Sequence, residues 1–255
     1  MIYELKNADK AIPLFEGWEE TMIWSCLQNV MGKIYGDDPE NPASAMAILG
    51  DFTFFAGKPN EELVGFKPEW CSRDFMIMVP QHQEWEPLIG RLYQEKARRG
   101  VRYAIKKEPE IFDRERLKRA ADSLPEGYTL SLIDEKIYHQ CLEHIWSRDL
   151  VSQYENYEQY RKLGLGVATL KNGEVVAGAS SYSSYRGGIE IEIDTREDQR
   201  RKGLAFSCGA RLILECLDRN LYPSWDAQNL RSAALAEKLG YHFDHEYVIY
   251  EIIGY

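Results

Sequence analysis

The sequence has no hydrophobic run long enough to span a membrane, no paired cysteines and no excess of positive charge. A membrane-spanning helix needs ~20 consecutive apolar residues, and the first residues lack the basic and apolar regions of a signal peptide. The five cysteines are scattered, odd in number and never arranged as C-x-x-C, so they predict neither a disulfide framework nor a metal site. We therefore expect a soluble, cytoplasmic protein with no membrane partner and no metal.

The formal net charge of the chain is -10 at pH 7. General binding to nucleic acid needs a broad basic face that attracts phosphates, so we expect no nucleic-acid partner. The motif G-x-x-x-x-G-K-[ST] is absent, which excludes an ordinary P-loop kinase. Because 44% of the 255 residues are hydrophobic, the chain can bury a substantial core and disorder is not expected.

One short basic segment stands out in this acidic chain. It reads Arg200-Arg201-Lys202-Gly203-Leu204-Ala205 and joins a strand predicted over 188–195 to a helix predicted over 204–219. A glycine at this junction removes the Cβ that would block the close approach of a ligand. The first N–H groups of a helix have no partner within it, and the helix dipole adds partial positive charge. The junction therefore predicts a phosphate-binding site.

The second half of the chain alternates strand and helix patterns, which indicates a mixed α/β sheet. Asn172-Gly173 lies between two strand-like runs and is a strong hairpin signal. Asn229 precedes a helical run that ends at Gly240, which predicts a capped helix. The expected order is strand 128–133, helix 134–146, strands 166–170, 175–184 and 188–195, helix 204–219, strand 222–227, helix 229–239 and strand 247–253.

The first half predicts a smaller mixed α/β domain. Its strands at 52–55, 75–79 and 101–106, with a helix over 84–99, echo the order of the second half and allow a degenerate copy of the same fold. Gln81-His82-Gln83 occupies the strand-to-helix turn, without glycine or arginine, so this copy would have no phosphate loop. Proline at 125 and glycine at 127 break regular structure, and we place the boundary between domains 1–122 and 123–255 there.

Three motifs in the expected order resemble those of the GNAT acyltransferase superfamily over residues 128–255. They are Arg200-x-x-Gly203-x-Ala205 after a strand, Asn229-x-x-Ser232 at a helix start, and Lys238-Leu239-Gly240-Tyr241 at its end. Within the superfamily, the two-part layout and the run over 225–229 look most like the zwittermicin A resistance acetyltransferase-like proteins.

The resemblance implies acetyl-CoA as co-substrate and no metal. It places the pyrophosphate on the loop amides and the pantetheine arm along the end of the preceding strand, with the Arg200 side chain either structural or in contact with phosphate. Asn229 and Ser232 match positions that lie along the pantetheine and the acetyl end. The implied cofactor-binding residues are Ile193, Asp194, Thr195, Arg200, Arg201, Lys202, Gly203, Leu204, Ala205, Asn229 and Ser232.

Acyl transfer to an amine needs a base, because the amine arrives mostly protonated at pH 7. Glu190 and Glu192 alternate with isoleucines, so both carboxylates project from one strand face and are the catalytic candidates. A solvated sheet face would explain the same alternation. The resemblance also implies a tyrosine that protonates the leaving thiolate, but Ala236 occupies its position.

These residues leave three functions open. The first is an acetyl-CoA-dependent N-acetyltransferase that moves an acetyl group directly from the thioester to an amine of a small molecule, an antibiotic or a metabolite. The second is a non-catalytic CoA-binding or sensor protein, because the usual tyrosine is absent. The third is a peptide- or tRNA-linked aminoacyltransferase, against which the acidic charge argues. The acceptor and the oligomeric state are not encoded in any motif.

Overall fold

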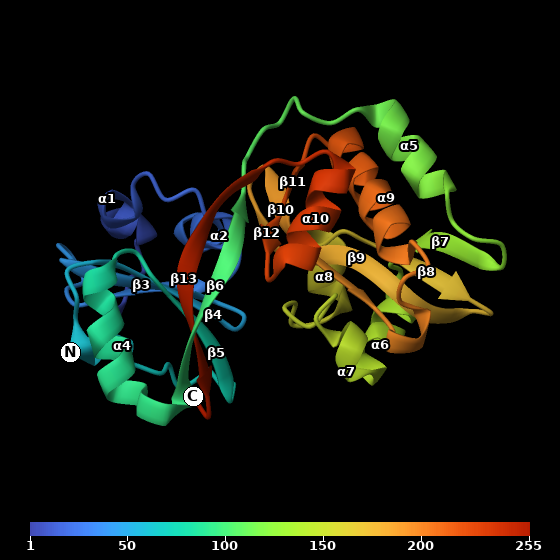
Figure 1. Ribbon diagram of the computed structural model, residues 1–255. Helices are drawn as coiled ribbons and strands as arrows, with labels where there is room; N and C mark the ends of the chain where they lie inside the picture. The colour runs from blue at the N-terminus through green and yellow to red at the C-terminus, as the bar shows by residue number, and fades with distance from the viewer. The chain divides into compact units, whose positions relative to one another are not determined.

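All residues, 1–255, are described by a computed structural model of the chain (Figure 1). Strands and helices alternate and build mixed sheets, which confirms the expected mixed α/β fold. Contacts divide the chain into two compact units: the first comprises Met1–Arg102 and Glu246–Tyr255, and the second Tyr103–His245. This division differs from the boundary expected after residue 122, which stays a prediction about independent folding. No helix has the length and apolar character needed to cross a membrane.

The first unit is built mainly from short strands and helices. Its elements are β1 (Tyr3–Glu4), α1 (Ile12–Phe15), α2 (Thr21–Leu27), β2 (Lys33–Gly36), β3 (Ser44–Leu49), β4 (Phe52–Gly57), α3 (Glu61–Val64), β5 (Phe75–Pro80), α4 (Glu86–Tyr93), most of β6 (Ala97–Ile105) and most of β13 (Phe243–Ile253), with 3₁₀ turns at Ala8–Ala11, Gln83–Trp85 and Gln94–Lys96.

The second unit contains the longer helices. Its elements are α5 (Arg114–Asp122), β7 (Tyr128–Leu132), α6 (Glu135–Glu143), α7 (Ile145–Arg148), α8 (Tyr157–Leu163), β8 (Gly166–Lys171), β9 (Glu174–Tyr185), β10 (Gly188–Thr195), a 3₁₀ turn at Glu197–Gln199, α9 (Leu204–Asp218), β11 (Tyr222–Ser224), β12 (Asp226–Ala227) and α10 (Leu230–Leu239).

In the first unit, β1 to β4 form an antiparallel meander, β5 runs parallel to β4, and β13 pairs antiparallel with β5. Strands β3 and β5 are almost wholly buried, and their nearly continuous apolar sequences fit burial on both faces of the sheet. Helix α4 lies over one face of this sheet (Figure 1). Phe55 of β4 stacks on Trp85 at 5.3 Å between ring centroids, and this pair centres the core.

The topology of the first unit shows where a phosphate loop would lie in it. In the second unit the loop lies between a strand and the helix that leads to the next parallel strand, β11. In the first unit, β4, α3 and the parallel strand β5 have this order, so the equivalent turn lies before α3 and not at 81–83, which follows β5. Asn60 caps α3, and Glu61 and Glu62 occupy its first turn. Their negative charges repel an anion. At the turn we expected, Gln81 accepts from the Gly57 N–H at 3.0 Å and donates to the Leu14 carbonyl at 2.7 Å.

In the second unit, the strand order is β11-β10-β9-β8-β7. The Asn172-Gly173 hairpin is confirmed: both residues have positive φ, and β8 pairs antiparallel with β9 on either side of them. Strand β10 pairs antiparallel with β9 and parallel with β11. The long helix α9 makes the crossover between these parallel strands, while β12 pairs with β6 at Tyr103 and Ala104 instead of joining this sheet.

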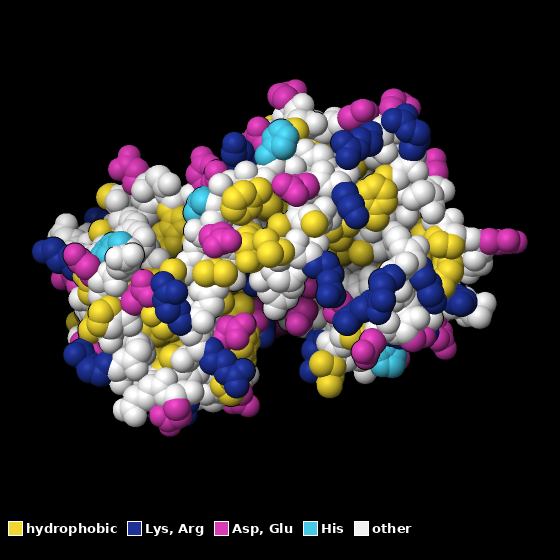
Figure 2. Space-filling view, viewed as in Figure 1, with side chains coloured by type: hydrophobic (Ala, Val, Ile, Leu, Met, Phe, Trp, Pro, Cys, Tyr) yellow, Lys and Arg dark blue, Asp and Glu magenta, His cyan; other side chains and the backbone are white.

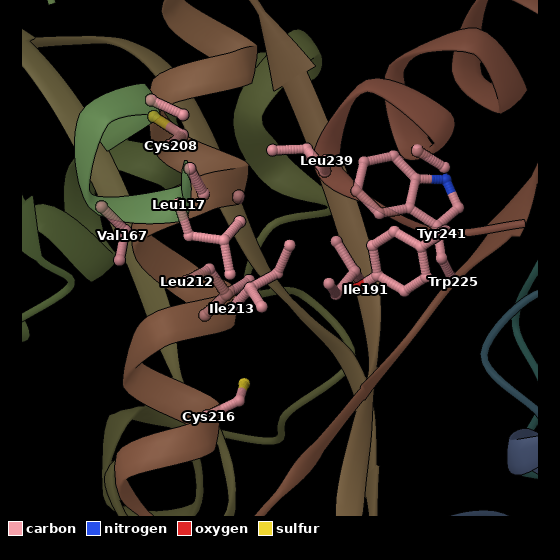
Figure 3. Packing of buried hydrophobic residues seen from close by; sticks show 14 of the residues in the cluster. Leu117, Val167, Ile191, Cys208, Leu212, Ile213, Cys216, Trp225, Leu239 and Tyr241 are labelled. Carbon is pink, nitrogen blue, oxygen red and sulfur yellow. The ribbon is translucent and has the colours of Figure 1, made fainter. Parts of the chain in front are cut away.

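The core of the second unit lies between its sheet and helices α5, α9 and α10. Cys208, Leu212 and Cys216 follow one another at intervals of four residues on α9 and are fully buried (Figure 3). Ile191 of β10 points into the same cluster, beside Trp225. Helices α6, α7 and α8 lie on the opposite face of the sheet (Figure 1). There the Leu150 side chain fills the space over Gly178 of β9. All five cysteines are buried and free.

The helix expected over 134–146 divides at His144, whose backbone is extended, into α6 and α7. Two further expected elements differ from the structure. The helix expected over 84–99 ends at Tyr93, because Gln94 adopts a φ of 48° and the residues from Ala97 onward join the sheet as β6. The expected strand over 222–227 is interrupted at Trp225: β11 pairs with β10, whereas β12 pairs with β6. In both places, pairing with a distant strand overrides the local pattern.

Candidate functional site

Strand β10 has an open edge along its second half. Its pairing with β11 ends at Glu190↔Ser224, because the chain diverges at Trp225 and β12 joins a different strand. From Ile191 to Thr195, the edge opposite β9 therefore has no neighbouring strand. The Arg196 N–H donates to the Val176 carbonyl of β9, so by alternation the peptide groups of Ile193 and Thr195 point to the open edge. An extended ligand can pair with the backbone there.

The open edge leads directly to the start of α9. Arg201 and Gly203 have φ values of 64° and 80°, so the backbone is left-handed on both sides of Lys202. No side chain caps α9, its first turn holds no acidic residue, and its first hydrogen bond runs from the Ser207 N–H to the Gly203 carbonyl. None of the turn hydrogen bonds of the loop uses an N–H group from Arg201 to Ala205. The N–H groups at the start of α9 are therefore available to an anion.

Arg200 shapes this loop from within. Its Nε donates to the Thr195 carbonyl at 3.2 Å, and its guanidinium lies 3.8 Å from the Asp194 carboxylate. The Thr195 N–H in turn donates to Asp194 at 2.6 Å. Burial and the charge of Asp149 raise the pKa of Asp194 despite these partners. Arg200 therefore ties the strand end to the loop, and of the peptide groups at the open edge, those of Ile193 stay available to a ligand.

Lys202 turns its side chain toward a cluster that the sequence did not reveal. Its Nζ donates to Gln199 Oε1 at 2.8 Å and to the Asp198 carbonyl at 3.2 Å. Gln199 also accepts from the Tyr128 hydroxyl at 2.7 Å, and Lys171 Nζ lies 3.5 Å from the same hydroxyl. No motif joins residues so far apart in sequence; only the pairing of β7 with β8 brings Tyr128 opposite Lys171.

Glu190 and Glu192 lie on the face of β10 opposite α9, because Ile189 and Ile191 point into the core on the α9 side. Glu190 is 4% exposed, so it is no solvated surface acid, whereas Glu192 is half-buried. The residues paired with Glu190 on the two neighbouring strands are both serines, Ser183 and Ser224. Each serine is fully buried and its hydroxyl has no hydrogen-bond partner. A buried polar row therefore crosses the sheet where β10 and β11 part.

The start of α10 is near this divergence in sequence and topology. The Asn229 side chain accepts from the N–H groups of Arg231 and Ser232 at 3.0 Å each, so it acts as the N-cap that its position predicted. The Ser232 hydroxyl accepts from the Trp225 indole at 3.1 Å. Ala236, one turn further along, is fully buried in the core. Both polar side chains therefore have structural partners, and position 236 offers no proton donor.

Tyr154, Tyr157 and Tyr160 pack mainly against neighbouring aromatic rings. Tyr154 and Tyr160 are buried and meet edge to face at 5.1 Å, and their hydroxyls bind serines of β9. Burial raises the pKa of Tyr154 to about 12 despite its hydrogen bonds to serine. Aromatic packing therefore accounts for these residues. The chain holds no group of three or more His, Cys, Asp or Glu side chains that could bind a metal ion.

Comparisons with known proteins give a family match and a related sequence. A family model described as GNAT acetyltransferase matches residues 12–250. An uncharacterised N-acetyltransferase of Bacillus subtilis, YdfB, is 28% identical over 244 residues, which cover 90% of this chain and 89% of that protein.

Solved structures show the same likeness. A GCN5-related N-acetyltransferase-like protein from Streptococcus suis is 49% identical, with a TM-score of 0.91 over 97% of this chain and 98% of its own. A tandem GNAT protein from the clavulanic acid biosynthesis pathway is 9% identical, with a TM-score of 0.55 over 100% of this chain and 98% of its own, and shares the fold alone.

Proposed function

The chain belongs to the GNAT acetyltransferase family, and we propose that it moves an acetyl group directly from acetyl-CoA to the amine of a small molecule, an antibiotic or a metabolite. The observation that carries this proposal is the open edge of β10, which leads into the uncapped loop before α9. A ligand that is extended and amide-bearing at one end and doubly anionic in its middle matches these two features. Acetyl-CoA has that form.

The residues of the loop and the strand end fit the two parts of acetyl-CoA differently. The N–H groups from Arg201 to Ala205 are free of turn hydrogen bonds and would bind the pyrophosphate, and the Arg201 side chain makes no ion pair within the protein. The Ile193 peptide groups are positioned to pair with the pantetheine amides. Asp194 and Thr195 support this edge through Arg200. In this proposal, Asn229 and Ser232 shape the wall of the site as capping and indole-binding residues.

Bound acetyl-CoA would supply the thioester, and the protein would supply the base. Glu190 is the stronger candidate, because it is buried at the point where β10 and β11 part and lies between two serine hydroxyls. These hydroxyls can hold the water or the amine from which Glu190 takes a proton. Glu192 lies on the same face of β10, two residues closer to the loop, and is the second candidate.

A non-catalytic CoA-binding or sensor protein is the second candidate function. It is favoured by Ala236, which places a methyl group inside the core where the family resemblance implies a tyrosine hydroxyl. Without that group, the leaving thiolate must take its proton from another residue or from water. The cofactor site is the same in both functions, and only turnover separates them.

Two measurements, made one after the other, test the proposal. Isothermal titration with acetyl-CoA should show one site per chain, and no heat at millimolar ligand would exclude both functions. A thiol-release assay against a panel of small amines, including amino sugars and diamines, should then show acetyl-CoA consumption that depends on the amine. Binding without turnover on any amine would favour the sensor. The narrower likeness to the zwittermicin A resistance acetyltransferases stays a prediction, which amine-bearing antibiotics in the panel would test.

A further inference from the structure

Two lysines in the second unit share one phenol oxygen and have no acidic partner. Lys171 Nζ and Lys202 Nζ each lie 3.5 Å from the Tyr128 hydroxyl, so the two ammonium groups are no more than 7.0 Å apart. Neither ammonium group makes an ion pair with a carboxylate, whereas nearby Arg196 pairs with both Glu174 and Asp198. In a chain of net charge -10, two cations held together without a counter-charge mark a place for an anion.

The cluster is held in place by buried and stacked groups. Gln199, which is 6% exposed, binds both the Lys202 ammonium at 2.8 Å and the Tyr128 hydroxyl at 2.7 Å. The Lys171 ammonium lies 5.0 Å from the centroid of the Tyr128 ring, which adds a cation–π contact. Burial opposes ionisation of Tyr128, but hydrogen bonds from the two lysines lower its pKa below the ordinary value. The local potential at this oxygen is therefore positive.

The cluster adjoins the loop before α9. Lys202 directly precedes Gly203, so its ammonium and the N–H groups at the start of α9 belong to one short segment. Lys and Arg side chains gather over this part of the second unit, around the ends of β8 and β9 and the loop (Figure 2). Lys202 thus links the cluster to the loop amides.

We propose that Lys171 and Lys202, presented by Tyr128 and Gln199, form a subsite for a phosphate monoester, which in acetyl-CoA is the ribose 3′-phosphate. The inference rests on the proposed function, because it assumes that the pyrophosphate occupies the loop. A phosphate monoester carries nearly two negative charges at pH 7 and accepts several hydrogen bonds, which suits two lysines that act as point charges. The cluster then lets the protein distinguish CoA from its 3′-dephospho form.

The test compares CoA with 3′-dephospho-CoA by isothermal titration at low salt. The protein should bind CoA at least roughly tenfold more tightly, since one charge-assisted contact is worth about one factor of ten or more. Lys171→Met should weaken CoA binding by a similar factor and leave 3′-dephospho-CoA unchanged. Lys162→Met, which removes an exposed lysine from the last turn of α8, is the matched control and should keep the full preference.

Three outcomes would overturn the inference. Equal affinity of the unchanged protein for the two ligands would show that the 3′-phosphate is not bound. Equal weakening of both ligands by Lys171→Met, with an unchanged melting temperature, would show that Lys171 acts on the loop and not on this phosphate. Inorganic phosphate that binds as tightly as CoA would show a general phosphate site. Failure of both CoA forms to bind the unchanged protein would instead refute the proposed function itself.

Discussion

Adding one negative charge at Gly203 tests whether the loop before α9 holds phosphate. Gly203 has a φ of 80°, and a Cβ built on it meets no atom within 4 Å, so the space is open but the backbone is left-handed. Asn and Asp both tolerate this conformation better than other residues with a Cβ. Gly203→Asn and Gly203→Asp therefore share bulk and backbone strain, and differ only in charge.

The expected difference between these two variants follows from Coulomb's law. A carboxylate about 5 Å from one phosphate charge meets a repulsion of about 0.8 kcal/mol in bulk water and about 3 kcal/mol at an effective dielectric constant of ~20. Since ~1.4 kcal/mol corresponds to tenfold in Kd, Gly203→Asp should bind acetyl-CoA roughly 4-fold to 150-fold more weakly than Gly203→Asn. The larger difference in affinity applies if the ligand excludes water from the loop.

The assay is isothermal titration of both variants with acetyl-CoA at low and high salt. Salt screens repulsion between exposed charges, so the difference between the variants should shrink as salt rises. Circular dichroism and thermal melting would show whether both variants fold alike. Equal affinities of Gly203→Asp and Gly203→Asn at low salt would refute the assignment of phosphate to this loop.

Three further predictions follow from single residues. Glu190→Gln should lower kcat by about 100-fold or more if Glu190 is the base, and Glu192→Gln should leave most activity; the reverse order would assign the base to Glu192. Leu212→Ala, in the core on α9, should lower the free energy of unfolding by about 2 to 5 kcal/mol in urea titrations, and a loss below 1 kcal/mol would contradict this packing. The hydrogen bond from Arg196 lowers the pKa of Asp198 to about 2, from 3.8 for the unfolded chain. A depressed carboxylate pKa stabilises the folded state above pH 3.8 and this contribution is lost as the pH falls toward 2, so Asp198→Asn should flatten the pH dependence of unfolding there.

The sequence determined the local elements of the second unit because their signals are local. The cap at Asn229, the end of its helix at Gly240 and the hairpin at Asn172-Gly173 all lie where the residue types require them. The loop before α9 is also local, since glycine and its flanking residues set the backbone that forms it. The strand-to-helix junction could therefore be predicted from six consecutive residues, while its binding of phosphate stays a prediction.

Pairing between distant strands decided the rest. The interruption at Trp225, which opens the edge of β10, exists because β12 pairs with β6 from more than a hundred positions earlier. Strand register gave Glu190 its two serine neighbours and placed Lys171 opposite Tyr128, while Lys202 reaches Tyr128 from the loop before α9. Each of these contacts joins residues whose local patterns carry no information about one another. The sequence by itself specified the loop that we propose binds an anion, and the tertiary structure added an open strand edge, a buried carboxylate and a cluster of two lysines.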